Sequence, residues 1–169
     1  MWLGDKLASE GPAAFYSADY FADYPPGYIL VLGLVSLVRK ALQLSYESRW
    51  TYFLLALIPA ICDCAAVVLL DHISRRYMGQ GRAQRCLVLF AAFCPLTLFD
   101  TGIWKQIDGA FALPLLLCFW LLEERRYLLA AVLYGVALAI KPQALLAGPV
   151  LAVCFLVAIA DAVRDAKAR

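Results

Sequence analysis

Long apolar segments separated by short polar clusters make up most of the chain. The clearest apolar runs lie at residues 50–70, 86–103, 111–122, 127–140 and 144–160. Such runs are typical of membrane helices, which need about 20 mainly apolar residues to cross a bilayer. The pattern therefore predicts an all-α, polytopic membrane helical bundle with about five membrane-spanning helices.

The apolar run at residues 28–44 does not fit this series, because Arg39 and Lys40 interrupt it and it is short for a span. If it crossed the bilayer, the polar residues before it would lie on the opposite side from the later polar clusters. We therefore expect an interfacial or re-entrant helix here. The predicted organisation is an exoplasmic loop with short helices at 1–27, a transmembrane region at 28–160 and a cytoplasmic tail at 161–169.

Composition agrees with a bilayer location. The chain has 169 residues, of which 64% are apolar, whereas soluble domains use about 45–50%. The net charge of +2 is small, and no basic patch interleaved with aromatic residues is present. Such a patch is what binding to nucleic acid requires, so the lipid bilayer is a predicted partner and nucleic acid is not.

The cysteines and the single histidine do not form a metal-binding pattern. All six cysteines lie within apolar runs, where free cysteine packs as a small hydrophobic residue. Cys62 and Cys64 would lie about 200° apart around a helix and could not hold one ion together. His72 lies beside Arg75 and Arg76 and is expected at the interface. The sequence therefore predicts no metal site and no cofactor.

Basic residues predict the orientation. The arginines between residues 75 and 85, the pair Arg125 and Arg126, and the basic tail should all be cytoplasmic under the positive-inside rule. The polar clusters at 104–108 and 141–143 would then share the exoplasmic side. With an interfacial or re-entrant segment at 28–44, the cluster at 23–28 would face that side too.

These three clusters are the candidate functional residues. Backbone broken by proline at membrane depth is tolerated where it is buried in protein or lines a wet cavity, and ionisable groups there suggest function. We therefore expect one polar site that faces one side of the membrane. Its members are Asp23, Tyr24, Tyr28, Trp104, Gln106, Asp108, Lys141 and Gln143.

Each cluster also has a purely structural explanation. Asp23 is either a helix-entry cap before Pro25 and Pro26 or a rigid carboxylate that binds a hydroxyl or positions a base. Trp104 and Asp108 are either a belt residue and a helix N-cap or a sugar-binding pair. Asp63, which lies within an apolar run, is expected to have a structural role.

Lys141 is either a snorkelling side chain or an anion-binding group. The run at 127–140 has 14 residues, or about 21 Å, which is short for a ~30 Å bilayer core. Lys141 should therefore lie below the membrane surface, at a helix break made by Pro142. An ammonium group at that depth needs an anion or water, which favours a phosphate-binding cavity.

The order of these elements resembles bacterial integral-membrane mannosyltransferases related to the second mannosyltransferase of GPI-anchor synthesis. More distantly, it resembles the dolichyl-phosphate-glucose-dependent glucosyltransferases of N-glycan assembly. Both groups belong to the C-type (GT-C) superfamily of glycosyltransferases. The residues that carry the resemblance are Trp2, Phe15, Tyr16, the run from Asp23 to Tyr28, Asp63, the run from Trp104 to Asp108, and Lys141, Pro142 and Gln143.

The resemblance implies inverting transfer of a hexose, with mannose favoured, from a polyprenyl-phosphate-linked donor to the hydroxyl of a lipid or glycan acceptor. The reaction would occur at the exoplasmic face of a bacterial plasma membrane, with a carboxylate as general base. Asp23 is the candidate catalytic residue. Gln106 and Asp108 would line the sugar site, and Lys141 and Gln143 would lie near the donor phosphate or sugar.

Three departures from the family pattern are expected to matter. In the family, an acidic residue that serves as the base lies just upstream of the tryptophan matching Trp2, after a first transmembrane helix. Further helices follow the region that matches Lys141. The bacterial loop also more often reads Trp-Gly-Gln, whereas this chain has Lys105. We therefore expect a fragment with a partial GT-C fold that is inactive alone.

Two other classes of function fit parts of the pattern. A transporter or flippase-like subunit also uses broken helices, but it should show repeated halves, and the sequence shows no convincing internal repeat. In a structural membrane subunit without catalysis, the polar clusters would be only caps and belt residues.

Overall fold

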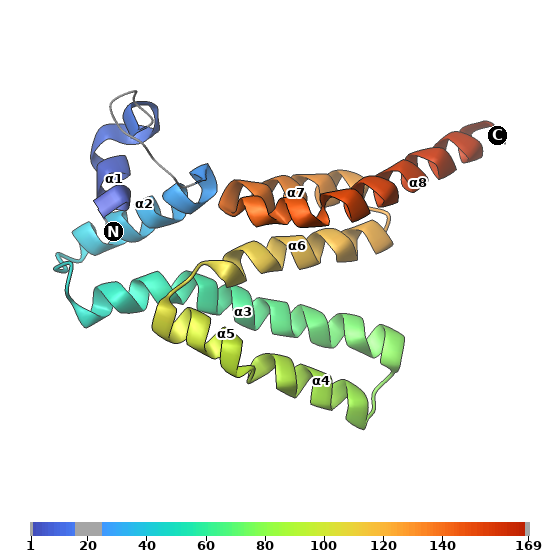
Figure 1. Cartoon of the computed structure of the whole chain (residues 1–169), viewed down its shortest axis with the longest axis horizontal. Helices are drawn as coiled ribbons and strands as arrows, with labels where there is room; N and C mark the ends of the chain where they lie inside the picture. The colour runs from blue at the N-terminus through green and yellow to red at the C-terminus, as the bar shows by residue number, and fades with distance from the viewer. Residues whose placement is uncertain (1, 16–24, 168–169) are drawn as a thin grey trace.

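A computed structural model of the chain describes residues 2–15 and 25–167, and within them all regular structure is helical (Figure 1). This confirms the prediction of an all-α membrane bundle. The longer helices are α1 Trp2–Phe15, α2 Pro26–Ala41, α3 Arg49–Met78, α4 Arg82–Ala92, α6 Asp108–Glu123, α7 Tyr127–Ile140 and α8 Gly148–Lys167. Three shorter elements connect them: α5 Pro95–Phe99, the π-helix η1 Asp100–Trp104 and the 3₁₀ helix η2 Pro142–Ala147.

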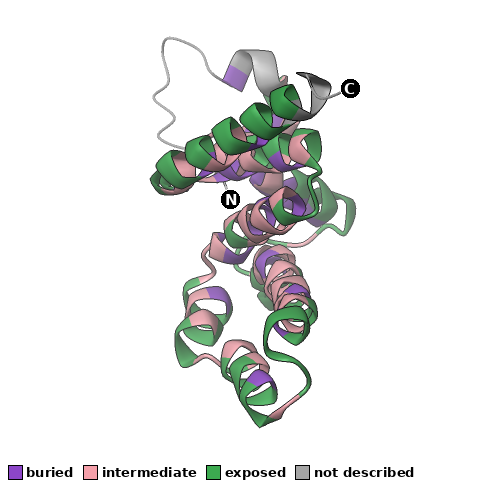
Figure 2. Cartoon of the chain, turned by 90° about the vertical axis from the view of Figure 1, so that its right-hand side faces the viewer, coloured by how far each residue is buried: buried purple, intermediate pink, exposed green. Residues whose placement is uncertain are grey.

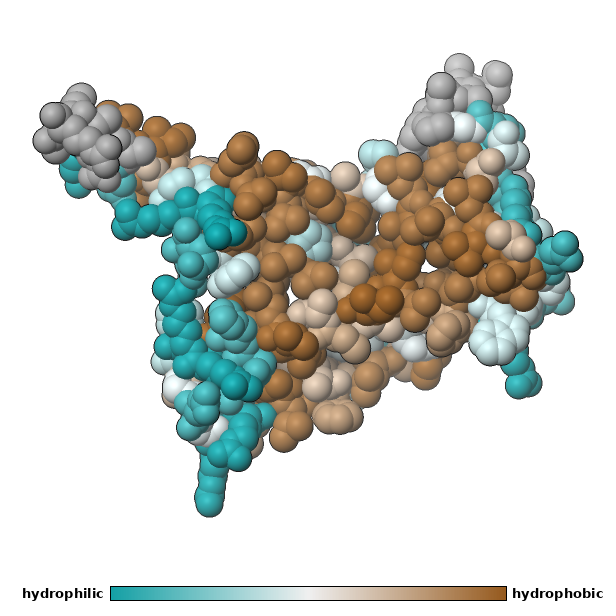
Figure 3. Space-filling model, turned by 180° about the vertical axis from the view of Figure 1, so that it is seen from behind, coloured by the Kyte–Doolittle hydropathy of each residue, from teal (hydrophilic) through white to brown (hydrophobic). Residues whose placement is uncertain are grey.

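Three helical segments of the described chain are long and apolar enough to cross a membrane, namely Arg49–Met78, Arg82–Trp104 and Pro142–Asp161. The surface agrees with this, because an apolar band separates two polar ends (Figure 3). One polar end holds the arginines of the α3–α4 and α6–α7 connections, and we call it the arginine-rich end. The opposite end holds the loop between α2 and α3.

Two other helices are shorter than the bilayer core. α6 has 16 residues and α7 has 14, which correspond to about 24 Å and 21 Å against a core of ~30 Å. The bounds of α7 agree with the expected run at 127–140. Together α6 and α7 form a hairpin whose turn lies at the arginine-rich end, where Arg76 of α3 donates to Glu124. The open end of the hairpin therefore stops inside the apolar band.

α2 continues from the open end of this hairpin. A Cβ added to Gly27 at the start of α2 would lie 2.6 Å from the carbonyl oxygen of Ala139, near the end of α7. From there α2 runs toward the opposite end, so that α7 and α2 lie end to end (Figure 1). α2, which is the segment expected to be interfacial or re-entrant, thus begins at the depth at which α7 ends.

Proline and glycine explain where several helices begin and end. Pro26 is the first residue of α2 and follows Pro25 at the N-cap, which fits the fixed φ of proline and its missing N–H. Gly79, with φ of 68°, ends α3, because glycine adopts positive φ without a steric penalty. α3 thus continues to Met78, beyond the apolar run that ends at residue 70, and Arg75 and Arg76 are helical.

One ion pair and two hydrogen bonds stabilise the helix beyond residue 70. Arg75 and Asp71, one turn apart on α3, form a salt bridge of 2.7 Å. The amide of Gln84, in α4, donates to Asp71 Oδ1 at 2.7 Å and to the hydroxyl of Ser74 at 3.2 Å. These contacts stabilise the polar last turns of α3 and join them to α4.

Buried residues lie where helices meet, and exposed residues cover the outward faces (Figure 2). One cluster fills the space between α6, α7 and α8, and another lies between α1 and α2. A third, built around Ile107, Ala110 and Ile140, joins α6 and α7 to residues of α2 and α3. All six cysteines are free, and Cys118 is fully buried in the first cluster.

α1 is attached to α2 by an ion pair between two buried residues. The Asp5 carboxylate accepts two hydrogen bonds of 2.9 Å from Arg39, and each of these residues is 8% exposed. Arg39 also donates to the carbonyl of Leu44 at 2.7 Å and lies 4.2 Å from the ring of Tyr46. One guanidinium therefore connects α1, α2 and the α2–α3 loop.

Candidate functional site

A polar cavity lies where the broken helices meet. It has a volume of about 400 Å³. Its lining comes from the start of α2, the connection between η1 and α6, and the connection between α7 and η2. The lining residues are Pro25, Tyr28, Trp104, Lys105, Gln106, Ile107, Ile140, Lys141, Pro142 and Gln143. Three segments that are distant in the sequence thus contribute to one cavity.

Lys141 is held at the cavity by a helix break. Its backbone is extended, with φ of −141° and ψ of 125°, as expected for a residue that precedes proline. The 3₁₀ helix η2 then starts at Pro142. The ammonium group donates to Oδ1 of Asp108, across the open end of the hairpin. The Lys141 side chain is 21% exposed and the Asp108 side chain is 47% exposed, so the ammonium group is partly shielded while the carboxylate remains accessible.

The π-helix η1 leads the chain into the cavity. π-helical turns are rare and occur frequently at functional sites. η1 ends at Lys105, whose N–H bonds to the carbonyl of Asp100 and whose φ of 56° and ψ of 39° are left-handed. This conformation costs a residue with a side chain about 1–2 kcal/mol. The turn places the ring of Trp104, which is 66% exposed, at the cavity wall.

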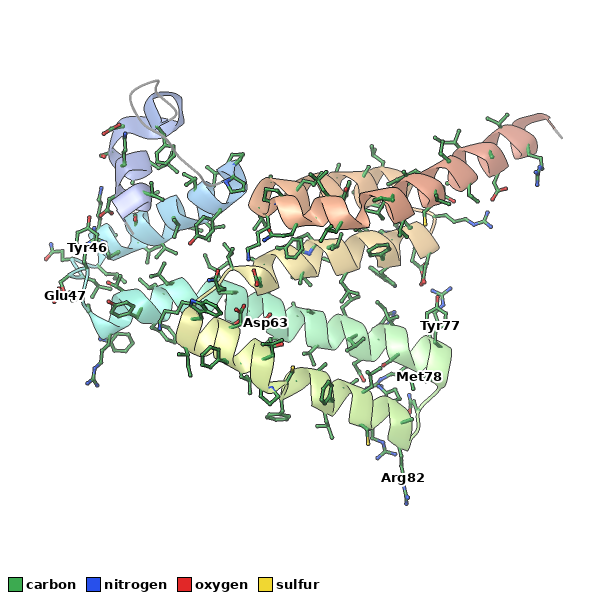
Figure 4. The ribbon with its side chains drawn as sticks, viewed as in Figure 1. Tyr46, Glu47, Asp63, Tyr77, Met78 and Arg82 are labelled. Carbon is green, nitrogen blue, oxygen red and sulfur yellow. The ribbon has the colours of Figure 1, made fainter. Side chains whose placement is uncertain are left out.

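Asp63 lies beside this site, about half-way along α3 and between the two polar ends (Figure 4). Its Oδ2 accepts a hydrogen bond of 2.5 Å from the Thr101 hydroxyl of η1. Gly109, at the start of α6, is so close that an added Cβ would lie 2.2 Å from Asp63 Oδ1. Asp63 therefore joins the middle of α3 to η1 and to the start of α6.

The structure brings Tyr28, Trp104, Gln106, Lys141 and Gln143 together around the cavity, and Asp108 joins them through Lys141. Asp23 and Tyr24 lie outside the described residues.

The alternative of an N-cap role for Asp108 is wrong. Ile107 is the N-cap of α6, and Asp108 lies in the first turn with its carboxylate on Lys141. The proline part of the structural explanation for 23–28 is correct, since Pro26 does start α2.

Sequence analysis missed two members of the site, Asp100 and Thr101. Thr101 holds Asp63, and Asp100 is close enough to Asp63, Asp108 and Lys141 to interact with them electrostatically. The available signal was an aspartate at the end of an apolar run, which is a default functional candidate at membrane depth. No sequence pattern indicated Thr101, because the role of its hydroxyl depends on the packing of η1 against α3.

A second, larger cavity adjoins the first across η1. It has a volume of about 700 Å³ and lies between α3, the α4–η1 segment and α6. Its lining is almost entirely apolar, with Asp63 and Thr101 among the few polar contributors. Residues inside η1 line the apolar cavity, whereas the last residue of η1 and the residues that follow it line the polar cavity. The polar cavity and the apolar cavity therefore meet at η1.

The combination of groups indicates which chemistry the polar cavity can perform. An ammonium group can bind an anion such as phosphate. Carboxylates and amides can hydrogen-bond sugar hydroxyls, and an exposed indole ring can stack on an apolar sugar face. Among the described residues, no group of three or more His, Cys, Asp or Glu side chains is arranged to hold a metal ion.

Comparison with known proteins gives one informative result. The model of glycosyltransferase family 87, a GT-C-type family of membrane glycosyltransferases, matches residues 21–163. No curated protein and no solved structure matches the chain. The matched segment covers most of the sequence and includes all of the polar cavity. The chain belongs to glycosyltransferase family 87.

Proposed function

We propose that this chain, which is not expected to be active alone, takes part in the transfer of a hexose, with mannose favoured, from a polyprenyl-phosphate-linked donor to the hydroxyl of a lipid or glycan acceptor. The observation that carries the proposal is the Lys141–Asp108 pair on a polar cavity inside the apolar band. An ammonium group with a carboxylate partner at this depth offers a site where an anionic headgroup can enter and share the lysine.

In this proposal, Lys141 binds the donor phosphate, with Gln143 beside it. The Asp108 carboxylate accepts hydrogen bonds from the sugar hydroxyls, the Gln106 amide both donates to them and accepts from them, and Trp104 stacks on the ring. The acceptor oxygen forms a bond to the anomeric carbon on one face while the bond to phosphate breaks on the other. The electron pair of the broken bond stays on the phosphate, and the acceptor proton goes to a carboxylate, for which Asp23 is the candidate.

The apolar cavity supports a lipid-linked donor rather than a soluble nucleotide sugar. A polyprenyl chain has no polar atoms, and burial of its surface is favourable at about 25 cal/mol per Å² relative to water. In the membrane this gain is much smaller, so the apolar cavity would mainly position the chain. The adjoining polar cavity would then receive the phosphate and sugar of the same molecule.

The proposal is tested by a transfer assay in native membranes with and without the gene for this protein. The probes are polyprenyl phosphate [¹⁴C]mannose and GDP-[¹⁴C]mannose, the latter with synthesis of the lipid-linked donor blocked. We expect label to pass to an extractable lipid or glycan acceptor only from the polyprenyl donor and only in membranes that contain the protein. Equal labelling in the deletion membranes, or transfer from GDP-mannose alone, would overturn the proposal.

The same proposal includes an exoplasmic site in a bacterial plasma membrane. The arginine-rich end carries Arg75, Arg76, Arg82, Arg85, Arg125, Arg126 and Arg164, whereas the opposite end carries Lys6, Arg39, Lys40 and Arg49. This bias supports a cytoplasmic arginine-rich end. The cavity would then open toward the exoplasmic side, and the polyprenyl donor would be used there.

Two exposed glutamines on opposite sides of α3 provide a matched test of orientation. Gln43 lies in the loop before α3, and Gln80 lies directly after it. In a variant without the six native cysteines, we expect Gln43→Cys to react with a membrane-impermeant maleimide in intact spheroplasts. Gln80→Cys should react only after permeabilisation. The reverse pattern would contradict the exoplasmic assignment.

A further inference from the structure

Lys105 has two features to which the proposed reaction assigns no role. It lies in the left-handed region with φ of 56° and ψ of 39°, which is a position that favours glycine. It lines the polar cavity from the η1–α6 wall, whereas Lys141 lines it from the α7–η2 wall. A residue held in a strained conformation at a site is a reason to look for a use of its side chain.

The ammonium group of Lys105 is only weakly held. It donates one hydrogen bond of 3.2 Å to the carbonyl of Ile103, and it lies 5.4 Å from the centre of the Tyr52 ring. In the part of the chain that the structure describes, no carboxylate pairs with it, in contrast to Lys141 with Asp108. The contacts of Lys105 can therefore be exchanged for a stronger anionic partner at little cost.

We propose that Lys105 is a second cationic contact for the phosphate of the lipid-linked donor and stabilises that phosphate as it leaves. The inference rests on the proposed function. In the donor, the phosphate joins the lipid to the sugar and carries one negative charge. When the bond from the anomeric carbon to the phosphate oxygen breaks, the electron pair remains on that oxygen and the phosphate becomes a dianion.

The charge of Lys141 is already partly balanced by Asp108, so Lys141 alone compensates only part of the charge of this developing dianion. A second ammonium group from the opposite wall compensates the additional charge, so its contribution should grow as the bond breaks. The flexible stem of lysine allows its ammonium to leave Tyr52 and the Ile103 carbonyl when the phosphate enters. Lys105 would then raise kcat and also tighten the binding of the dianionic product.

The test measures binding of farnesyl phosphate and farnesol to the purified full chain in nanodiscs. Farnesyl phosphate represents the dianionic product, and farnesol has the same tail without charge. We expect Lys105→Gln to weaken farnesyl phosphate binding by about 10-fold or more and to leave farnesol binding unchanged. Lys105→Arg should retain most of the binding, because it keeps the charge.

The variant Lys105→Gly separates the effect of the lost charge from the effect of the backbone conformation. It removes the ammonium but suits the left-handed conformation, so its thermal unfolding temperature should be no lower than that of the wild type. We expect it to lose farnesyl phosphate affinity as Lys105→Gln does. Unchanged affinity in both variants would overturn the role of Lys105, and loss of affinity only together with loss of stability would do so too.

This design separates the inference from the proposal on which it rests. If wild-type protein binds farnesyl phosphate no more tightly than farnesol, the phosphate-binding cavity itself is wrong. If Lys141→Gln removes the preference for farnesyl phosphate and the Lys105 variants do not, the polar cavity does bind phosphate, and the proposed role of Lys105 is wrong.

Discussion

Replacing Lys141 by glutamine is expected to reduce sugar transfer by about 100–1000-fold, the range typical of removing one preorganised electrostatic contact to a developing anion. Glutamine fills similar space but has no charge to offer the departing phosphate. The loss should appear mainly in kcat, because the interaction strengthens as negative charge accumulates on the phosphate. The measurement is the rate of label transfer from polyprenyl phosphate [¹⁴C]mannose in native membranes that contain each variant.

Lys40→Gln is the matched control, since it removes the same charge from an exposed position on α2 outside the cavity. Its transfer rate should stay within about two-fold of wild type. If Lys141→Gln folds normally and transfers sugar at the control rate, the role of Lys141 in the reaction is contradicted.

Replacing Arg39 by methionine is expected to destabilise the protein by about 3–5 kcal/mol, because the Asp5 carboxylate would remain buried without its partner. Both residues are 8% exposed, and Arg39 makes two hydrogen bonds to Asp5 and one to the Leu44 carbonyl. The loss should release α1 from α2. Urea unfolding of the protein in mild detergent, followed by tryptophan fluorescence, measures the change.

The neighbouring residue supplies the control for this prediction. Lys40→Met makes the same kind of change at an exposed position, with only a 3.5 Å contact to the Asp5 carbonyl, and should change stability by less than about 1 kcal/mol. The double variant Asp5→Leu with Arg39→Met should recover much of the lost stability, because no charge is then left buried. Equal stability of Arg39→Met and Lys40→Met would contradict the importance of the pair.

Much of the fold follows from local patterns in the sequence. Apolar runs predict the helices, and Pro142 predicts the break after Lys141, because proline removes a backbone donor and restricts the residue before it. The 14-residue length of α7 predicts that this break lies below the membrane surface, and the structure has the same bounds for α7. These features depend on a few neighbouring residues, so a single sequence is sufficient to read them.

The features that could not be predicted depend on contacts between distant segments. The end-to-end arrangement of α7 and α2 depends on the absence of a side chain at Gly27 beside Ala139. The continuation of α3 past residue 70 depends on Gln84 of the next helix, which binds Asp71. The left-handed backbone of Lys105 opposes its own preference and is stabilised by the bond to Asp100 that closes η1. No periodicity in the sequence reports such contacts.

The most direct test of the central claim, that the polar cavity binds the phosphate of a lipid-linked sugar, is photo-crosslinking. The probe is a farnesyl phosphate that carries a diazirine next to the phosphate, and the modified peptides are mapped by mass spectrometry. We predict labelling of residues 104–108 and 140–143, suppressed by excess farnesyl phosphate but not by farnesol. Labelling confined to the arginine-rich end, or equal suppression by the two competitors, would contradict the account.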